Sequence, residues 1–78
     1  MKQNFKSNMK LTISFWLNGQ KYYTDKNLTL YEILLYFDYN HSVLVLEYNN
    51  LICKQSYWTK TFVSNFDRIE IVTIVGGG

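Results

Sequence analysis

The group with the clearest chemical use in this sequence is the carboxylate of its last residue. Gly76, Gly77 and Gly78 follow Val75, which closes an apolar run, so this tail carries no side chains. Such a tail fits a narrow active site in which any Cβ would clash. Its α-carboxylate, with an ordinary pKa of about 3.5, is ionised at neutral pH and is able to attack the α-phosphorus of ATP. A frayed terminus is the alternative, but the position directly after a predicted strand favours the chemical interpretation.

The reactive side chains do not form a catalytic set. Cys53 is the single cysteine, so neither an internal disulfide nor a thiolate metal cluster is possible. Its apolar surroundings favour a small buried hydrophobic residue over a persulfide relay. His41 has no second ligand or nucleophile nearby and is interpreted as a solvated loop residue. No spacing recommends an acid–base pair among the scattered acidic residues, which are Asp25, Glu32, Asp38, Glu47, Asp67 and Glu70.

Length and composition predict one domain. The 78 residues, of which 47% are hydrophobic and 18% aromatic, provide one core and no material for a second. The net charge of +2 and the single arginine, Arg68, argue against nucleic acid as a partner. Residues 1–8 lack an apolar signal region, and no apolar run approaches the roughly 20 residues of a membrane helix. We therefore expect no secretory signal and no membrane span, and the single cysteine fits a reducing compartment.

The first predicted element is a hairpin. Residues 10–17 alternate in polarity, which predicts a half-buried strand with Trp16 on its outer face. The inner face is expected to hold Leu11, Ile13, Phe15 and Leu17. Asn18-Gly19 predicts a type I′ turn, because both central positions of that turn need positive φ. Residues 20–24 are then the returning strand.

A helix is predicted to begin after Thr29. Glu32, three residues later, completes a capping box with Thr29, and Leu28 and Ile33 are spaced as a hydrophobic staple. Asn40 is expected to end the helix in the left-handed conformation. The helical stripe that faces the core consists of Leu30, Ile33, Leu34 and Phe37.

The second half of the chain predicts further extended segments. Residues 43–48 form a strand, residues 51–53 a short extended piece, and residues 54–62 an irregular segment anchored by Trp58. Residues 68–75 form the last strand, with Ile69 and Ile71 pointing inward.

This order of elements predicts an α+β, ubiquitin-like β-grasp fold. We expect a mixed four-stranded sheet, with the first and last strands as parallel neighbours and one main helix packed on one face. Other α+β roll topologies fit the same order. The domain is expected to span residues 9–75, between a flexible arm at 1–8 and a flexible glycine tail at 76–78.

The chain resembles the ThiS family, the sulfur carriers of thiamin (thiazole) biosynthesis, over about residues 9–78. The matching parts are Val45-Leu46-Glu47-Tyr48-Asn49, Trp58, and the closing stretch from Asp67 to Gly78. That closing stretch is similar to cyanobacterial and algal plastid members in particular. The bias toward Asn, Lys, Tyr, Ile and Phe agrees with a plastid genome.

The resemblance implies a function for the tail. In the family, an adenylating enzyme uses ATP to activate the terminal glycine, which corresponds to Gly78, while Gly76 and Gly77 provide the tail. Sulfur from a cysteine desulfurase then gives a thiocarboxylate, from which thiazole synthase takes the sulfur. The chain would be a cosubstrate rather than an enzyme, with no bound cofactor or metal, in the plastid stroma or the bacterial cytoplasm. Three alternatives stay open: a molybdopterin-synthase-type sulfur carrier, a ubiquitin-like modifier conjugated through Gly78, and, less favoured, a small nucleic-acid-binding module.

Two positions depart from the family pattern. Phe66-Asp67 replaces the usual Gly-Asp before the last strand. Phe66 must therefore avoid positive φ or accept strain of about 1–3 kcal/mol, and we expect a reshaped turn. Asn50 replaces a glycine in the turn after the third strand, where Asn tolerates the left-handed region.

Three side chains are predicted to form a partner surface. Trp16, Val72 and Ile74 are expected to face away from the helix and to form one apolar patch across the neighbouring first and last strands. Monomers rarely leave such a patch unused, so we expect it to dock the adenylating enzyme, with basic side chains at its rim.

Overall fold

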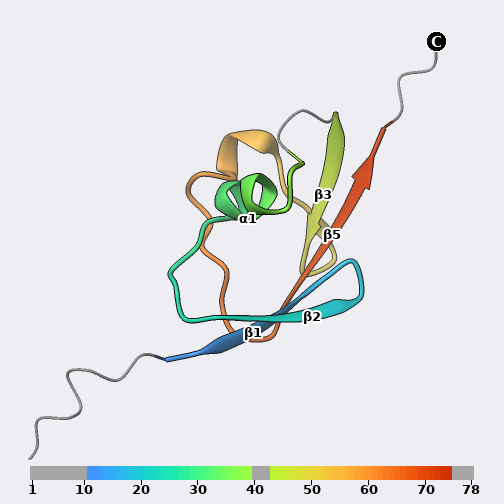
Figure 1. Cartoon of the computed structure of the whole chain (residues 1–78). Coiled ribbons are helices and arrows are strands. Elements are labelled where there is room, and N and C mark those ends of the chain that lie inside the picture. The colour runs from blue at the N-terminus through green and yellow to red at the C-terminus, as the bar shows by residue number, and fades with distance from the viewer. Residues whose placement is uncertain (1–10, 40–42, 75–78) are drawn as a thin grey trace, which may run out of the picture.

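The computed structural model describes residues 11–39 and 43–74, which form a mixed sheet with one helix across one face (Figure 1). The elements in chain order are β1 (Ile13–Leu17), β2 (Gln20–Thr24), α1 (Leu30–Tyr36), β3 (Leu44–Tyr48), β4 (Leu51–Ile52), the 3₁₀ turn η2 (Gln55–Tyr57) and β5 (Asp67–Thr73). The strand order is β2-β1-β5-β3-β4, and β1 and β5 are parallel neighbours, as predicted. The sheet has five strands rather than four, because the short piece at Leu51–Ile52 pairs with β3. The predicted arm at 1–8 and tail at 76–78 lie outside the described residues.

The β1–β2 hairpin closes through the predicted turn. Asn18 and Gly19 have φ angles of 49° and 82°, the two positive values that a type I′ turn requires. The strand begins at Ile13, which pairs with Thr24, rather than at residue 10. The prediction for Leu11 was wrong: it has no partner in the β1–β2 ladder, and its side chain is 85% exposed.

The helix begins as predicted and ends earlier. The Glu32 N–H donates to Thr29 Oγ1 at 3.1 Å, and the Thr29 N–H donates to Glu32 Oε1 at 2.8 Å, which is the predicted capping box. Leu30, Ile33 and Leu34 of the predicted stripe are fully buried, and Phe37 is half-buried at the C-cap.

Asp38, rather than Asn40, adopts the left-handed conformation that ends the helix. Its φ is 64°, and its N–H donates to the Leu35 carbonyl at 3.1 Å. The Tyr39 N–H donates to the Leu34 carbonyl at 2.8 Å. These two bonds make a Schellman motif, with an aspartate where glycine is usual. Asn40 itself lies outside the described residues, as does His41.

The core lies between α1 and the inner face of the sheet. Trp58 packs against it and donates from Nε1 to the Cys53 carbonyl at 2.9 Å, so the predicted anchor of the irregular segment is confirmed. Cys53 is half-buried beside the same core. The fully buried apolar side chains are Phe15, Leu17, Leu30, Ile33, Leu34, Leu46, Val63, Ile69 and Ile71.

The turn before β5 is not reshaped by Phe66. This residue has a φ of 70°, the conformation that favours glycine, and its side chain is 70% exposed. Contacts on both sides hold the turn: the Phe66 N–H donates to the Ser14 carbonyl at 2.6 Å, and the Ser14 N–H donates to Asn65 Oδ1 at 2.8 Å. Phe66 therefore accepts the strained conformation, and the expectation of a different turn was wrong. Asn50 adopts a φ of 73°, as expected.

Candidate functional site

The strand that leads to the glycine tail is the central strand of the sheet. β5 pairs with β1 on one side and with β3 on the other. Its path is fixed as far as Ile74, whose N–H donates to the Val43 carbonyl at 2.7 Å. Gly76, Gly77 and Gly78, the predicted reacting residue and its tail, lie outside the described residues. What the structure defines is therefore the rigid base from which the tail extends.

Two turn asparagines complete the hydrogen bonding of β5 where its partner strands end. Asn18, after β1, donates its N–H to the Ile69 carbonyl at 2.9 Å and accepts the Ile71 N–H on Oδ1 at 2.7 Å. Asn49, after β3, donates its N–H to the Arg68 carbonyl at 2.8 Å and accepts the Arg68 N–H on Oδ1 at 2.8 Å. The sequence analysis assigned only a turn to each. Asn has a side-chain amide that donates and accepts hydrogen bonds, and Gly, the other common turn residue, does not. The choice of Asn at these two turns could therefore have indicated such contacts.

Asp67 fixes the start of β5. It is buried, and its carboxylate accepts hydrogen bonds from the Tyr48 hydroxyl, from Asn49 Nδ2 at 3.0 Å and from the Ser64 N–H at 2.6 Å. Burial raises the pKa of Tyr48 above its ordinary value, and the hydrogen bond to Asp67 and the negative charge of that carboxylate raise it further. These three hydrogen bonds join the start of β5 to β3 and to the turns beside it, so the cluster positions the strand.

The face of the sheet opposite α1 is divided into two apolar parts. Trp16 pairs with Arg68 across β1 and β5, and its ring lies under two cations, with Arg68 Cζ at 5.2 Å and Lys21 Nζ at 5.6 Å from the ring centre. Val72 lies four positions beyond Arg68, about 13 Å along the strand, with Glu70 between them. The predicted single patch of Trp16, Val72 and Ile74 is therefore wrong in its extent.

Val72 and Ile74 instead form a patch with two side chains of the neighbouring strand. Val45 pairs with Val72, and the hydrogen bond from the Ile74 N–H to the Val43 carbonyl continues this register two residues further along each strand. These four residues, Val43, Val45, Val72 and Ile74, are called the valine patch below. Val72 is 62% and Ile74 52% exposed. The sequence analysis did not include Val43 and Val45 in the partner surface. Their alternate positions in the 43–48 segment place them on one face of the strand and could have indicated it.

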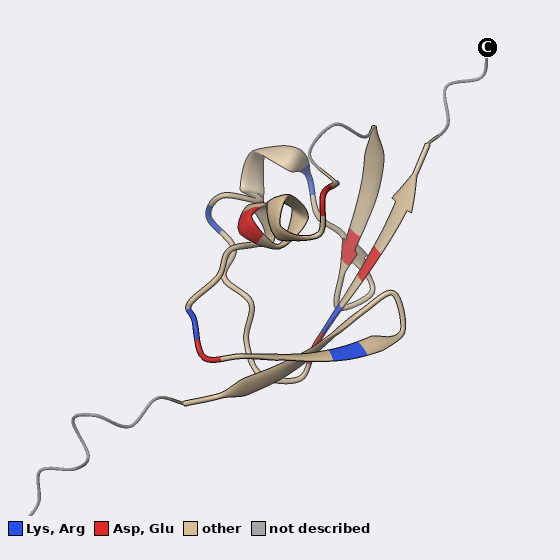
Figure 2. Ribbon diagram, viewed as in Figure 1, with Lys and Arg blue, Asp and Glu red and all other residues tan. Residues whose placement is uncertain are grey.

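A pair of glutamates separates the valine patch from Trp16, Lys21 and Arg68, which are called the Trp16 cluster below. Glu47 and Glu70 lie directly opposite each other on β3 and β5, where Figure 2 shows the two acidic positions side by side. Like charges at opposed positions are unfavourable in an isolated sheet. A partner that covers this face would relieve the repulsion by placing a cation there.

Two other kinds of site receive no support from the structure. Among residues 11–39 and 43–74, no group of three or more His, Cys, Asp or Glu side chains is placed to hold a metal ion. No helix in the same described part of the chain is long and apolar enough to cross a membrane.

The sheet order, the helix across one face and the central position of β5 define a small β-grasp protein. A family model described as the ThiS family matches residues 15–78, and the chain belongs to this family. It has the fold of the family's small sulfur carriers, which are not themselves catalytic enzymes.

The chain is also similar to proteins that share one name. The chain is 58% identical over 65 residues to a protein of Trieres chinensis named "Uncharacterized protein ycf40", a match that covers 83% of this chain and 89% of the relative. Proteins of the same name from Pyropia yezoensis and Porphyra purpurea are 32% and 33% identical over 66 residues, covering 85% of this chain and 93% of each relative.

A solved structure has the same fold. The thiamine biosynthesis protein ThiS from Geobacter metallireducens superposes with a TM-score of 0.71 at 22% identity, covering 85% of this chain and all of the other. At this identity the likeness establishes the β-grasp fold.

Proposed function

We propose that this protein is a sulfur carrier for the thiazole part of thiamin and that its working group is the carboxylate of Gly78. The observation that carries the proposal is the family match, which runs over residues 15–78 and includes all three tail glycines. The geometry of β5 supports it, because a strand held on the β1 side as far as Ile71 and on the β3 side as far as Ile74 gives the following glycines a fixed origin. An adenylating enzyme then receives the tail at a defined distance from the docked domain.

The chemistry uses the carboxylate twice. One of its oxygens attacks the α-phosphorus of ATP in the partner's site, and pyrophosphate leaves. A persulfide sulfur, which a cysteine desulfurase supplies, then attacks the carbonyl carbon, and AMP leaves with one former carboxylate oxygen. A thiol reductant cleaves the resulting acyl disulfide, forms a disulfide with the departing sulfur donor, and leaves the thiocarboxylate. Thiazole synthase takes the sulfur from this group, so the protein is a cosubstrate that holds no cofactor of its own.

The valine patch is the surface that we assign to the adenylating enzyme. It lies at the end of β5 from which the tail departs, whereas the Trp16 cluster lies at the other end of the paired region. Val43, Val72 and Ile74 are large and exposed apolar side chains, and together they supply a hydrophobic centre for an interface. Glu47 and Glu70 beside them favour a basic group on the partner.

The names of the relatives support a plastid location. The designation ycf40 belongs to reading frames of plastid genomes, which agrees with the stroma as the site of action.

Intact mass spectrometry tests the proposal. The protein is incubated with ATP, a ThiS-type adenylating enzyme, cysteine, a cysteine desulfurase and a thiol reductant, and the expected mass gain matches the replacement of one oxygen by sulfur at Gly78. Omission of ATP is the control and should leave the mass unchanged. A conjugate on a lysine instead would identify a protein modifier. Sulfur delivery to a molybdopterin synthase but not to thiazole synthase would identify the molybdopterin carrier. A mature protein with residues beyond Gly78 would contradict both the terminal role and the chemistry.

A further inference from the structure

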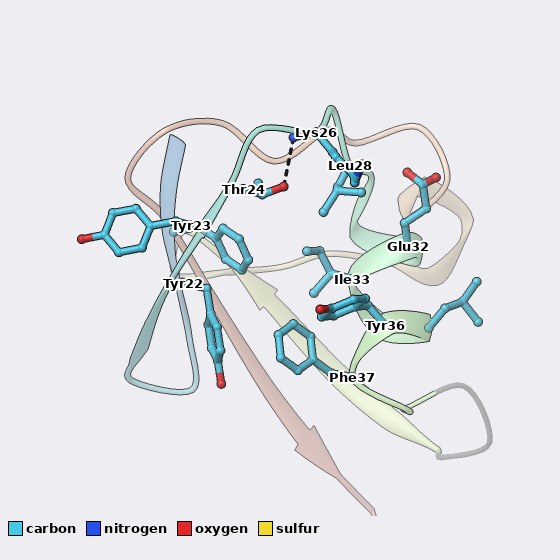
Figure 3. Close-up of a pocket in the computed structure, with 11 residues that line it drawn as sticks. Tyr22, Tyr23, Thr24, Lys26, Leu28, Glu32, Ile33, Tyr36 and Phe37 are labelled. Atoms are coloured by element: carbon cyan, nitrogen blue, oxygen red, sulfur yellow. Dashed lines mark hydrogen bonds between the residues drawn. The ribbon is translucent and has the colours of Figure 1, made fainter. Parts of the chain in front are cut away.

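A groove of about 530 Å³ runs between α1 and the edge strand β2, on the helix side of the sheet (Figure 3). Figure 3 shows Tyr22 of β2 on one side, facing Phe37 from the helix end, and their ring centres are 4.9 Å apart. Ile33 lies at the floor, and the rim includes Leu35 and Tyr36, which are both exposed. Tyr36 is 81% exposed although it stands on an apolar groove. This surface is separate from the valine patch, which lies on the opposite face.

The strand beside the groove has an unpaired edge. β2 is the last strand on its side of the sheet. In a two-residue hairpin the residues that flank the turn, here Leu17 and Gln20, form a hydrogen-bonded pair, and such pairs alternate along the ladder. The peptide groups of Gln20, Tyr22 and Thr24 therefore face β1. Those of Lys21 and Tyr23 face outward, and they present donors and acceptors at the spacing of a further strand.

The charges at this edge indicate what kind of strand fits. Lys21 and Lys26 are exposed near the two ends of the edge. Lys26 lines the groove, whereas Lys21 Nζ lies over the Trp16 and Tyr23 rings, 5.6 and 5.5 Å from their centres, on the opposite face. Glu32, the acidic residue that lines the groove, already accepts hydrogen bonds from the Thr29 N–H and hydroxyl at 2.8 and 3.1 Å, and Asp25 has an interaction partner of its own. An added strand places its side chains alternately on both faces of the sheet, so it meets Lys26 on the groove side and Lys21 on the opposite face, and both lysines favour acidic residues.

We propose that this groove binds an extended segment of a partner protein, which adds to β2 as a sixth strand. Its peptide groups pair with those of Lys21 and Tyr23. Its alternate side chains are apolar and enter the groove between Tyr22 and the helix, and its flanking residues are acidic. This mode of recognition combines main-chain pairing for affinity with side-chain pockets for selectivity. The site is independent of the carrier chemistry, so a second protein is able to hold the carrier while its tail reacts.

Selection from a phage-displayed library of random dodecapeptides on the full-length protein tests the proposal. We expect enriched peptides with alternating apolar residues next to Asp or Glu. Their affinity should fall at least about tenfold for Leu35→Asp and for Tyr36→Asp, which each put a charge on the groove rim. Leu51→Asp, an exposed apolar residue on the other edge strand, should leave affinity unchanged. Tyr36→Asp keeps the test valid if Leu35→Asp does not fold. No enrichment, or enriched peptides that bind both rim variants like the parent protein, would overturn the proposal.

A second measurement distinguishes strand addition from hydrophobic binding without main-chain pairing. On titration with an enriched peptide, the amide resonances of Lys21 and Tyr23 should shift and their hydrogen exchange should slow, because each gains a main-chain partner. The double change Lys21→Glu and Lys26→Glu should weaken the acidic peptides about tenfold. Shifts confined to β4 or to the valine patch, or enriched peptides that are basic, would contradict the proposed mode.

Discussion

Asn18 Oδ1 accepts a hydrogen bond from the Ile71 N–H at 2.7 Å, which connects the turn between β1 and β2 to β5. The two residues are far apart in sequence, and the bond forms just beyond the point where β1 stops pairing with β5. The same residue holds the φ of 49° that the type I′ turn needs. Asn18 therefore serves local turn geometry and long-range strand order together, and these two roles are separable by mutation.

Asn18→Gly should keep the turn and lose the tie to β5. Glycine adopts positive φ readily, so the expected destabilisation, about 1–2 kcal/mol, reflects the lost bond to Ile71, the lost bond from Asn18 Nδ2 to the Tyr39 hydroxyl at 3.2 Å, and the greater chain entropy of glycine. Asn18→Ala loses both functions and should destabilise more, by about a further 1 kcal/mol for the left-handed conformation. Denaturant unfolding measures both values, and amide exchange at Ile71 should speed up in both variants. Equal stability of the glycine variant and the parent protein would show that the side-chain bond contributes nothing.

Phe66→Gly should stabilise the protein. Phe66 has a φ of 70° with its ring mostly in solvent, so glycine removes strain without removing core contacts. The strain relieved is about 1–2 kcal/mol, and the greater chain entropy of glycine costs about 0.5–1 kcal/mol, which leaves a net gain of up to about 1.5 kcal/mol. Asn50→Gly is the matched control, because Asn at a φ of 73° is less strained and should gain less. A destabilised Phe66→Gly variant would show that the ring makes a favourable contact.

The hairpin and the start of the helix were predictable because their signals are local. Asn18-Gly19 and the Thr29–Glu32 capping box involve residues close in sequence, and both form as expected. The end of the helix was misplaced because Asp38 takes a conformation for which Asn40 is the better intrinsic candidate.

The candidate surface was predicted only in part because it depends on register. Alternation placed Trp16 and Val72 on the same face, as the structure has them. Only the pairing of Trp16 with Arg68 shows that they are far apart along the sheet. Pairing also brings Val45 to Val72 and Glu47 to Glu70, which no single segment reveals. The Asp67 cluster was missed for the same reason, because its partners come from separate turns and strands.

Alkaline pH should destabilise the fold through Tyr48. Its pKa is raised in the folded state, mainly by burial and then by Asp67, so the folded protein holds the hydroxyl proton more tightly than the unfolded chain. The protonated Tyr48 hydroxyl therefore contributes to the free energy of unfolding. This contribution is fully present below the ordinary tyrosine pKa of about 10 and is lost as pH rises above it. Unfolding free energies measured across this range should decline, and Tyr48→Phe should be less stable at neutral pH but show a shallower decline. An unchanged slope in Tyr48→Phe would assign the pH dependence to other groups.

Charges on the valine patch should weaken docking of the adenylating enzyme. Val72→Asp and Ile74→Asp each remove an exposed apolar side chain, and burying one at an interface contributes about 1.5–3 kcal/mol, so each change should raise Kd by at least about tenfold. Thermal stability should be nearly unchanged because both side chains are already in solvent. Leu51→Asp, whose leucine is 74% exposed on the edge strand β4, is the matched control with unchanged affinity. Parent-like affinity of both patch variants would place the enzyme elsewhere.

Changes in tail length should abolish adenylation without affecting the fold. One residue added after Gly78 moves the carboxylate by up to about 3.6 Å, as large as the whole near-attack distance of about 3–3.5 Å, and deletion of Gly78 shortens the reach by as much. Added glycine tests reach alone, whereas added alanine also brings a Cβ into the partner's narrow channel. ATP–pyrophosphate exchange should therefore be lost in all three variants. Their melting temperature should equal that of the parent, because the last main-chain bond that the structure describes, at Ile74, precedes the altered residues. Full-rate adenylation of an extended and untrimmed protein would show that Gly78 is not the reacting residue.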